Sequence, residues 1–314
     1  MINLSEELKN VKSVAISGHI RPDGDCLGST LGLRNYIIDN CPGVFVSVYL
    51  LMPIPLDFDF LRGYDEIKTE YDGEEFDLFI ACDCGAEDRL DKNAVLIKHA
   101  KRVLCIDHHE ISRTPVPYDE SYIDPPASST CELVYNLLDV DKISKSTAEC
   151  LYTGIVHDTG KFQFQCCHRS TMEAAGVLME KGIDYSRIID ETFNFKTFTQ
   201  IKLLGYAIDK AELALDGQMI VSVLTLSDFE KFGANSKDTE GIVQRLRETK
   251  GIRIAVFLYE TEPGEFKGSM RCNDDTDLSR VCAHFGGGGH KKAAGFSSSL
   301  SAPEIIQKLI ELVK

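Results

Sequence analysis

The chain has 314 residues, 43% of them hydrophobic and 26% charged, and its formal net charge is −15. This length exceeds one comfortable hydrophobic core and predicts two domains. The acidic excess excludes the broad basic surface that long nucleic acids require, so any nucleic-acid substrate should be short.

The N-terminal segment and the cysteines set further limits. Residues 1–12 are polar and of mixed charge, unlike a signal peptide, and the longest apolar run, residues 44–52, is too short to cross a membrane. The eleven cysteines form no pair of CxxC motifs, which favours free thiols in a reducing compartment over zinc or disulfides. We therefore expect a cytoplasmic protein with no membrane partner.

The first half of the chain alternates strand patterns with helical patterns. Near-continuous apolar runs predict buried strands at residues 13–17, 44–50, 76–81 and 102–106. Helical patterns occupy residues 25–40 and 90–99, and further helices follow at 129–138, 146–156, 171–181 and 185–192. This alternation predicts a doubly wound parallel sheet in an N-terminal α/β domain that spans residues 1–192.

The second half predicts a smaller C-terminal α/β domain. Residues 193–199 are interpreted as a linker, and the domain then covers residues 200–314. Helices are expected at 200–213, 239–248, 278–285 and 303–313, and strands at 219–225, 252–259 and 265–272. We expect the two domains to face each other across a cleft that contains the active site.

Aspartate and histidine side chains gather after the predicted strands and at one helix end. Three groups follow the strands that end near residues 17, 80 and 106, and a fourth follows a helix that ends near residue 157. Because ligands bind at the carboxyl ends of parallel strands, three of these groups should converge on one sheet edge. The residues concerned are His19, Asp23, Asp25, Asp83, Asp107, His108, His109 and Asp158.

Such a cluster indicates divalent cations. Converging carboxylates repel one another and lose hydration, which is costly without positive ions between them. Imidazole and carboxylate ligands without a thiolate suit Mn²⁺, with Mg²⁺, Co²⁺ or Fe²⁺ as alternatives. Two ions roughly 3.5–4 Å apart can share a carboxylate and activate a water for phosphoester hydrolysis. Each group alone is also typical of a turn, a helix cap or a polar strand end, and only their joint occurrence favours the metal site.

A second informative segment is the run of four glycines at residues 286–289, which is followed by His290, Lys291 and Lys292. Unobstructed backbone N–H groups beside positive charge can bind an anion. Arg271, on the preceding predicted strand, is a candidate for a bidentate phosphate contact. The alternatives are a flexible hinge or tight packing between strand and helix for the glycines, and a surface position for the arginine. The spacing matches neither a P-loop nor a dinucleotide-binding turn.

Together these segments resemble a known family. Residues 19–29 (HIRPDGDCLGS), Asp83, residues 107–109 (DHH) and residues 158–160 (DTG) resemble the four motifs of the DHH phosphoesterase superfamily. Residues 286–295 (GGGGHKKAAG) resemble the signature of the DHH-associated C-terminal domain. The length, the compact spacing and residues 126–132 (PASSTCE) are most similar to the branch of nanoRNases and pAp (3′-phosphoadenosine-5′-phosphate) phosphatases.

The resemblance implies a role for each candidate residue. Six side chains would hold two metal ions: His19 and Asp23 on the first, Asp25, His108 and Asp158 on the second, and Asp83 bridging both. Asp107 would orient a ligand, and His109 would face the scissile phosphate as an electrophile or proton donor. Four residues of the C-terminal domain would hold the phosphate of the substrate: Arg271, Gly288, Gly289 and His290.

Two positions differ from the family pattern. Cys272 stands where a serine is expected, which bears on contacts with the substrate. His157 stands where a small or hydroxylated residue is commoner, and it is either an additional histidine near the metals or a residue that only ends a helix.

The implied activity is that of a Mn²⁺-dependent hydrolase that cuts short oligoribonucleotides (nanoRNA) to mononucleotides and pAp to AMP. Its partners would be short RNAs and small nucleotides but no long duplexes, and a homodimer is left open. The same site also suits linear or cyclic dinucleotides (pApA, cyclic-di-AMP), polyphosphate or pyrophosphate. A long-strand exonuclease and a non-catalytic RNA- or nucleotide-binding module are the remaining alternatives. The glycine-histidine segment favours nucleotides, and the intact metal motifs favour catalysis.

Overall fold

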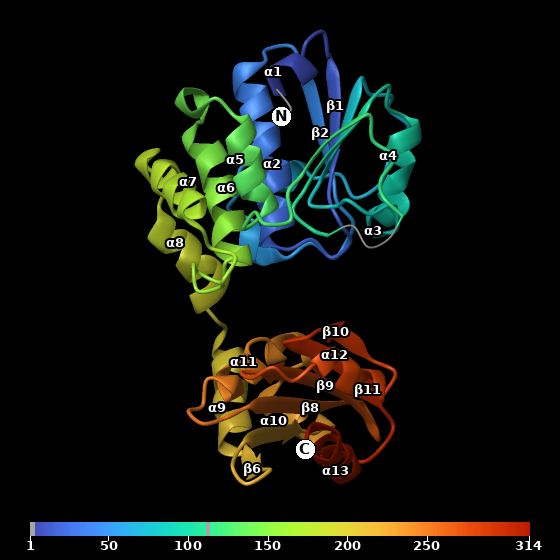
Figure 1. Ribbon diagram of the computed structural model, residues 1–314, viewed down its shortest axis with the longest axis vertical. Coiled ribbons are helices and arrows are strands. Elements are labelled where there is room, and N and C mark those ends of the chain that lie inside the picture. Colours follow the sequence, from blue (N-terminus) through green and yellow to red (C-terminus); the bar gives the residue numbers. More distant parts are fainter. Residues whose placement is uncertain (1–3, 111–113) are drawn as a thin grey trace. The chain divides into compact units, whose positions relative to one another are not determined.

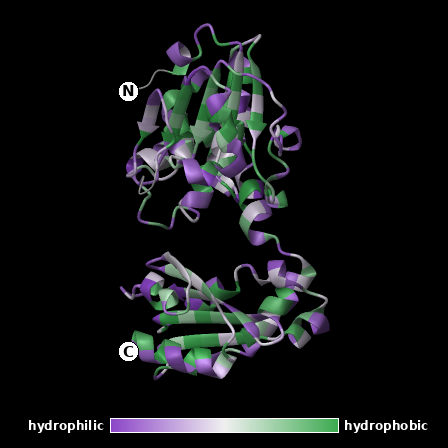
Figure 2. Ribbon diagram, turned by 90° about the vertical axis from the view of Figure 1, so that its right-hand side faces the viewer, coloured by the Kyte–Doolittle hydropathy of each residue, from purple (hydrophilic) through white to green (hydrophobic). Residues whose placement is uncertain are grey.

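The computed structural model describes residues 4–110 and 114–314. Contacts within the chain divide it into two units, Met1–Phe195 and Lys196–Lys314 (Figure 1). Hydrophobic residues concentrate in the strands of each unit, and hydrophilic residues lie mainly on the outer helices and loops (Figure 2). Each unit therefore has its own sheet and its own core.

The sheet of the first unit is parallel throughout, with the strand order β2-β1-β3-β4-β5. Its strands are β1 (Ser13–Ser17), β2 (Phe45–Tyr49), β3 (Leu78–Cys82), β4 (Val103–Asp107) and β5 (Glu120–Ile123). The predicted doubly wound parallel sheet is confirmed. β5 was not predicted, because this half-exposed edge strand of sequence ESYI lacks the apolar run of a buried strand.

Helices cover both faces of this sheet. The core beneath α2, α5, α6 and α7 is continuous with the strands, and α3 and α4 lie on the opposite side (Figure 1). The helices are α1 (Leu4–Glu7), α2 (Gly24–Asn40), α3 (Glu87–Leu90), α4 (Val95–Lys98), α5 (Thr130–Leu137), α6 (Lys145–Asp158), α7 (Arg169–Glu180) and α8 (Tyr185–Ile189). A π-helical turn, Asp190–Asn194, follows α8.

The helix predicted at residues 90–99 is broken in the structure. It consists of a 3₁₀ turn, Asp91–Ala94, and the single α-helical turn of α4. Asp91 has a left-handed backbone (φ 50°), which an α-helix cannot continue through. The side-chain amide of the buried Asn93 donates hydrogen bonds to Ser17 Oγ and to the carbonyl of Tyr49, both at 3.1 Å. This turn thus ties β1 to β2 instead of extending a helix.

The second unit is built on a mixed six-stranded sheet with the order β10-β11-β9-β8-β7-β6. β7 and β8 are parallel, and the other neighbouring pairs are antiparallel. The strands are β6 (Glu212–Ala214), β7 (Met219–Leu224), β8 (Ile254–Glu262), β9 (Glu265–Cys272), β10 (Gly288–His290) and β11 (Ala293–Ser298). The helices are α9 (Phe198–Asp209), α10 (Leu226–Phe232), α11 (Ile242–Arg247), α12 (Leu278–Ala283) and α13 (Ala302–Val313).

Two apolar layers sandwich this second sheet. α12 and α13 share one core with one face of the strands, and α9, α10 and α11 share another core with the opposite face. The helix predicted at residues 200–213 instead begins at Phe198, because Thr197 and Gln200 form a capping box, and it ends before β6. β6, β10, β11 and α10 were not predicted, since they are short or rich in glycine and alanine. Among the described residues, no helix is both long and apolar enough to cross a lipid bilayer.

Candidate metal centre

The predicted site residues of the first unit meet at the carboxyl ends of β1, β3 and β4, which are adjacent in the sheet. His19 lies just beyond β1, and Asp83 follows β3 directly. Asp107 is the last residue of β4, so His108 and His109 leave the sheet at the same edge. The convergence expected from strand order is therefore present.

The N-terminus of α2 brings two more aspartates to this edge. Asp23 caps the helix, since its Oδ1 accepts hydrogen bonds from the backbone N–H groups of Asp25 and Cys26, both at 3.1 Å. Asp25 is buried in the first turn of the helix. α6 packs against α2 and ends at Asp158, which places that carboxylate beside the others. The positive end of the α2 dipole also favours negative charge here.

The backbone carbonyl of the next residue orients the ring of His19. Its Nδ1 lies 2.8 Å from the carbonyl oxygen of Ile20, which can only accept a hydrogen bond. In the neutral ring Nδ1 therefore carries the proton and Nε2 presents a lone pair, as in histidines that bind metals. It lies 3.2 Å from Asp83 Oδ2 and 3.8 Å from Asp23 Oδ1.

His108 repeats this arrangement on the other side of Asp83. Its Nδ1 lies 3.2 Å from the carbonyl oxygen of Ala127. Its Nε2 lies 3.0 Å from Asp158 Oδ2 and 3.8 Å from Asp25 Oδ2. Both histidines thus direct Nε2 toward a pair of carboxylates.

The N-terminus of α5 holds two of the aspartates from behind. The backbone N–H groups of Thr130 and Cys131 donate to the two carboxylate oxygens of Asp25, at 2.6 and 2.9 Å. The hydroxyl of Thr130 donates to Asp83 Oδ1 at 3.0 Å. These contacts were not predicted from the sequence. Their signal was the capping Ser129 within the PASSTCE segment, whose hydroxyl accepts from a backbone N–H in the first turn of α5.

Asp83 is at the centre of the cluster. Its backbone is left-handed (φ 56°), an uncommon conformation for aspartate that the surrounding hydrogen bonds maintain. Oδ1 lies 3.3 Å from His109 Nδ1 and 3.7 Å from His108 Nε2, and Oδ2 lies against His19. Its two oxygens therefore face different histidines of the cluster.

Asp107 and His109 form a second pair within the site. The Oδ1 of Asp107 accepts hydrogen bonds from the backbone N–H of His109 at 3.1 Å and from its Nδ1 at 2.8 Å. The carboxylate of Asp107 is buried, whereas the side chain of His109 is 43% exposed. Asp107 thus fixes the ring of His109 and leaves its outer edge accessible to a ligand.

Burial and mutual charge shift the pKa values of the cluster. Burial alone would raise the pKa of Asp83, but hydrogen bonds from His109 and His19 lower it below its usual range. Burial and the charge of Asp83 raise the pKa of Asp25. Burial opposes protonation of His19 and His108, yet neighbouring carboxylates raise their pKa values to about 10 and about 9. Without cations, protons on these side chains therefore offset the negative charge of the carboxylates.

The donor atoms fit divalent cations. The Nε2 atoms of His19 and His108 are buried and have no hydrogen-bond partner of acceptable geometry among the described residues. Three sets of donors lie within 4.8 Å of one another: His19, Cys26 and Asp83; Asp83, His108 and His109; and Asp25, His108 and Asp158. Burial raises the pKa of the Cys26 thiol well above its ordinary value, so this sulfur remains a protonated, poor ligand. The oxygen and nitrogen donors match a hard or borderline cation.

His157 belongs to the packing around the cluster. Its ring stacks on Phe193 with a centroid distance of 4.2 Å and meets the ring of Phe58 edge-on at 4.9 Å. A Cβ atom at Gly24, the first residue of α2, would come within 2.7 Å of His157 Cβ. The side chain thus fills the space between α2 and two aromatic rings.

The predicted phosphate-binding residues lie together on the sheet of the second unit. The strand register aligns Arg271 of β9 with Ala293 of β11, and Ala293 with His290 of β10. The glycine run is not a free loop, because Gly288 and Gly289 pair with β11. Gly289 has φ 142°, and a Cβ there would come within 2.7 Å of the Ala293 carbonyl, so only glycine fits without strain.

Cys272 lies on the opposite face of that sheet. Its side chain is buried in the core beneath α12 and α13, and its thiol donates to the carbonyl of Thr276 at 3.3 Å. Alternate residues of a strand point to opposite faces, so Cys272 points away from the face that carries Arg271. The departure from serine at this position therefore concerns packing.

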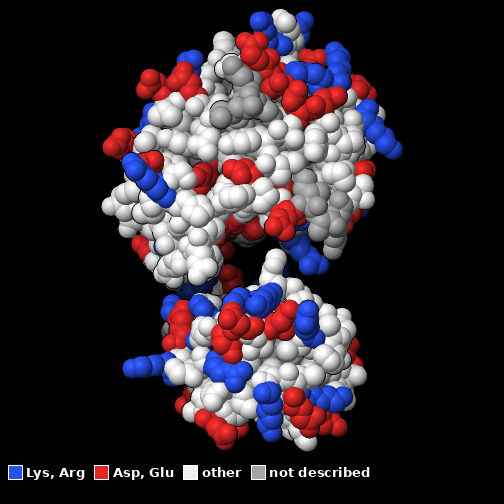
Figure 3. Space-filling view, viewed as in Figure 1, with Lys and Arg blue, Asp and Glu red and all other residues white. Residues whose placement is uncertain are grey.

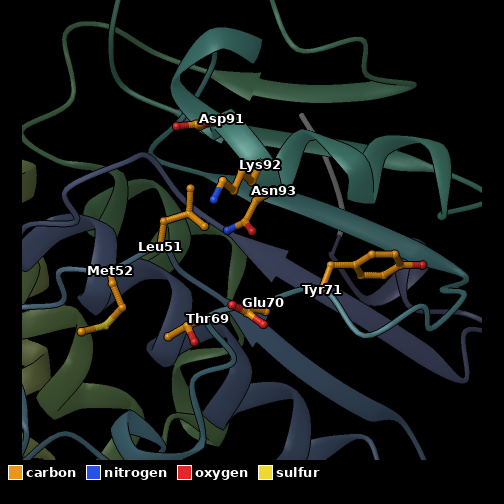
Figure 4. A pocket seen from close by; sticks show the side chains of 8 residues that line it. All are labelled: Leu51, Met52, Thr69, Glu70, Tyr71, Asp91, Lys92 and Asn93. Atoms are coloured by element: carbon orange, nitrogen blue, oxygen red, sulfur yellow. The ribbon is translucent and has the colours of Figure 1, made fainter.

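A separate pocket of about 500 Å³ lies on the first unit, beyond the carboxyl end of β2. Figure 4 shows Leu51 facing Lys92 and Asn93 across it. None of the predicted metal ligands is among its lining residues. Over the described residues in view, acidic and basic side chains are interspersed, without a broad basic surface (Figure 3).

Comparison with known proteins identifies both units. A model of the DHH family, N-terminal domain, matches residues 13–155, and the DHHA1 domain matches residues 216–314. The bifunctional oligoribonuclease and PAP phosphatase NrnA of Bacillus subtilis (strain 168) is 29% identical over 293 residues, which cover 91% of this chain and 89% of that protein. A probable NrnA of Streptococcus mutans is 28% identical and covers 98% of this chain and 97% of its own length. The crystal structure of an exopolyphosphatase-related protein from Bacteroides fragilis matches 99% of this chain and 94% of that one, with a TM-score of 0.88 and 26% identity.

Proposed function

The chain carries the DHH and DHHA1 domains of the DHH family, and from this premise we propose that it is a two-metal phosphoesterase. Its proposed reactions are the hydrolysis of short oligoribonucleotides to mononucleotides and of pAp to AMP. The observation that carries the proposal is a pair of buried histidine nitrogens on either side of Asp83. Nε2 of His19 is directed at Asp83 and Asp23, and Nε2 of His108 is directed at Asp158 and Asp25. The similarity to the two NrnA proteins supports these substrates.

The proposed ligands are those that the family resemblance implies, and all but Asp23 belong to the sets of donors described above. The first metal would be held by His19 and Asp23, the second by Asp25, His108 and Asp158, and Asp83 would lie between them. Mn²⁺ is the proposed cation, since carboxylate and imidazole donors suit it, and Mg²⁺ and Co²⁺ are alternatives. Bound there, the ions would supply Lewis-acid charge and lower the pKa of water.

Other side chains and backbone groups would position the aspartates and bind the substrate. α5 keeps Asp25 and Asp83 in position through the backbone N–H groups and hydroxyl described above. Asp107 holds His109 Nδ1, so the exposed edge of the ring can donate a hydrogen bond or a proton to a phosphoryl oxygen. In the second unit, Arg271, His290 and the glycine backbone would bind another phosphate of the substrate and so limit its length.

We propose a separate role for each of the two domains. Residues 1–192 would form the metal-binding catalytic domain, residues 193–199 a linker, and residues 200–314 the substrate-binding domain. The compact units found in the structure, divided between Phe195 and Lys196, are compatible with that division.

A substrate panel tests the proposal. Purified protein with Mn²⁺ is incubated with single-stranded RNAs of two to about twenty nucleotides, with pAp, and with pApA, cyclic-di-AMP and pyrophosphate. We expect mononucleotide release that declines as RNA lengthens, and phosphate release from pAp. Turnover confined to cyclic-di-AMP or to pyrophosphate would contradict the proposed substrates, and binding without turnover of any compound would contradict catalysis.

A further inference from the structure

The sheet of the second unit has an open region on one face, next to Arg271. Two rows of paired residues cross it: His290, Ala293 and Arg271 in one, and Gly288, Gly295 and Ser269 in the other. A Cβ at Gly288 would meet no atom within 4 Å. The small residues of β10 and β11 therefore leave space beside the Arg271 side chain.

A second arginine, Arg247, is fixed at the border of this region. It is the last residue of α11, which packs on β8 and β9. Its Nη1 donates to Asn273 Oδ1 at 2.9 Å, and the side-chain amide of Asn273 donates back to the Arg247 carbonyl at 2.9 Å. Asn273 lies two residues after Arg271, just beyond the end of β9 at Cys272. Arg247 is thus held next to Arg271.

Neither guanidinium is neutralised by a carboxylate of the described residues. The described partners of Arg247 are amide oxygens of Asn273 and Gln244, and that of Arg271 is the carbonyl of Met270. Other arginines of this unit do have carboxylate partners, among them Arg245 with Glu248 and Arg253 with Asp274, both at 2.7 Å.

The absence of a neutralising acid has a physical consequence. Burial and the positive charge of Arg247 lower the pKa of Arg271, so the charged form of Arg271 is disfavoured there. In a chain with a net charge of −15, two adjacent cations without an acidic partner indicate a site that an external anion completes.

We propose that Arg247 determines specificity by binding, together with Arg271, a terminal phosphate of the substrate on the side away from the scissile bond. This inference rests on the proposed function. A terminal phosphate carries a charge of roughly −1.5 to −2 at neutral pH and so matches two guanidinium groups, whereas a phosphodiester carries one charge and matches only one. Substrates that end in a phosphate are therefore preferred to those that end in a hydroxyl.

The kinetic test compares Arg247→Gln with the matched control Arg245→Gln, an exposed arginine of the same helix. Each variant is assayed on pApA and on ApA, which lacks the 5′-phosphate. Arg247→Gln should raise KM for pApA about tenfold or more, change KM for ApA less than about twofold and leave kcat unchanged, because a charge-assisted hydrogen bond is lost. Arg247→Lys, which keeps the charge, should recover part of the affinity. Equal effects on both substrates, or no effect on either, would overturn the inference.

A binding measurement separates this inference from the proposed activity. AMP and adenosine are titrated into the protein by calorimetry in the presence of EDTA, so that no turnover is required. Selective loss of AMP binding in Arg247→Gln supports the inference even if no substrate is hydrolysed. Undiminished AMP binding in Arg247→Gln, or no AMP binding by the wild-type protein, contradicts it whatever the activity.

Discussion

The hydroxyl of Thr130 offers a sharp test of how the metal centre is held in shape. Thr130→Val keeps the β-branched shape and the backbone N–H that binds Asp25, and removes only the hydrogen bond to Asp83. A buried hydrogen bond to a charged group contributes roughly 1.5–3 kcal/mol. Groups that orient metal ligands typically change metal affinity by about 10- to 100-fold, and we expect Mn²⁺ binding to weaken within that range.

The assay is calorimetric titration of Mn²⁺ into EDTA-stripped protein, together with the Mn²⁺ concentration that gives half-maximal hydrolysis. Thr153→Val is the matched control, since Thr153 is also buried and, among the described residues, its hydroxyl donates only to the backbone carbonyl of Glu149, at 2.7 Å. Thermal unfolding in EDTA verifies that both variants fold. If Thr130→Val binds Mn²⁺ within twofold of wild type, the α5 N-terminus does not position Asp83 and the reasoning is wrong.

Three further predictions follow from the same site. First, Mn²⁺ affinity should rise as pH increases from 6 to 9, with protons released on binding. Metal ligation requires neutral His19 and His108, whose pKa values are raised to about 10 and about 9, and ionised Asp25, whose pKa is also raised. Calorimetry in buffers of different ionisation enthalpy measures the proton release, and an affinity independent of pH would refute the prediction. Second, Gly24→Ala should destabilise the protein by about 1–3 kcal/mol, because the added methyl group would overlap His157. Gly176→Ala, in open space on α7, should instead stabilise it by about 0.5–1 kcal/mol. Urea unfolding in EDTA measures both free energies, and equal effects would contradict the packing described. Third, His109→Ala should lower kcat by roughly 10²- to 10⁴-fold. Metal affinity should stay near that of wild type, since His109 Nδ1 is hydrogen-bonded to Asp107. A large loss of metal affinity would instead indicate that His109 is a metal ligand.

Strand patterns were sufficient to predict that the site residues converge, because parallel sheets bind ligands at the carboxyl ends of their strands. His19, Asp83 and Asp107 each stand at the end of a strongly apolar run, and parallel strands bring such ends to one edge. The mutual orientation of the side chains could not be predicted in the same way. The left-handed backbone of Asp83 and the two N–H groups that bind Asp25 depend on how α5 packs behind the sheet.

The second unit shows the limits of sequence patterns more clearly. The glycine run was expected to bind an anion, and no strand was predicted there, but Gly288 to His290 form a strand. Because a run of glycines has no hydrophobic periodicity, its pairing with β11 could not be predicted from the sequence pattern. Arg247 was one of many charged residues in the sequence, and only the packing of α11 on β9 and its bond to Asn273 place it beside Arg271.

The central claim is that hydrolysis depends on cations held around Asp83. Its most direct test measures mononucleotide release from a short RNA and phosphate release from pAp, with Mn²⁺ present and after chelation, for wild type, Asp83→Ala and the exposed control Asp65→Ala. We expect turnover by wild type and Asp65→Ala with Mn²⁺, none after chelation, and none by Asp83→Ala. Turnover that survives complete chelation, or near wild-type activity in Asp83→Ala, would contradict it.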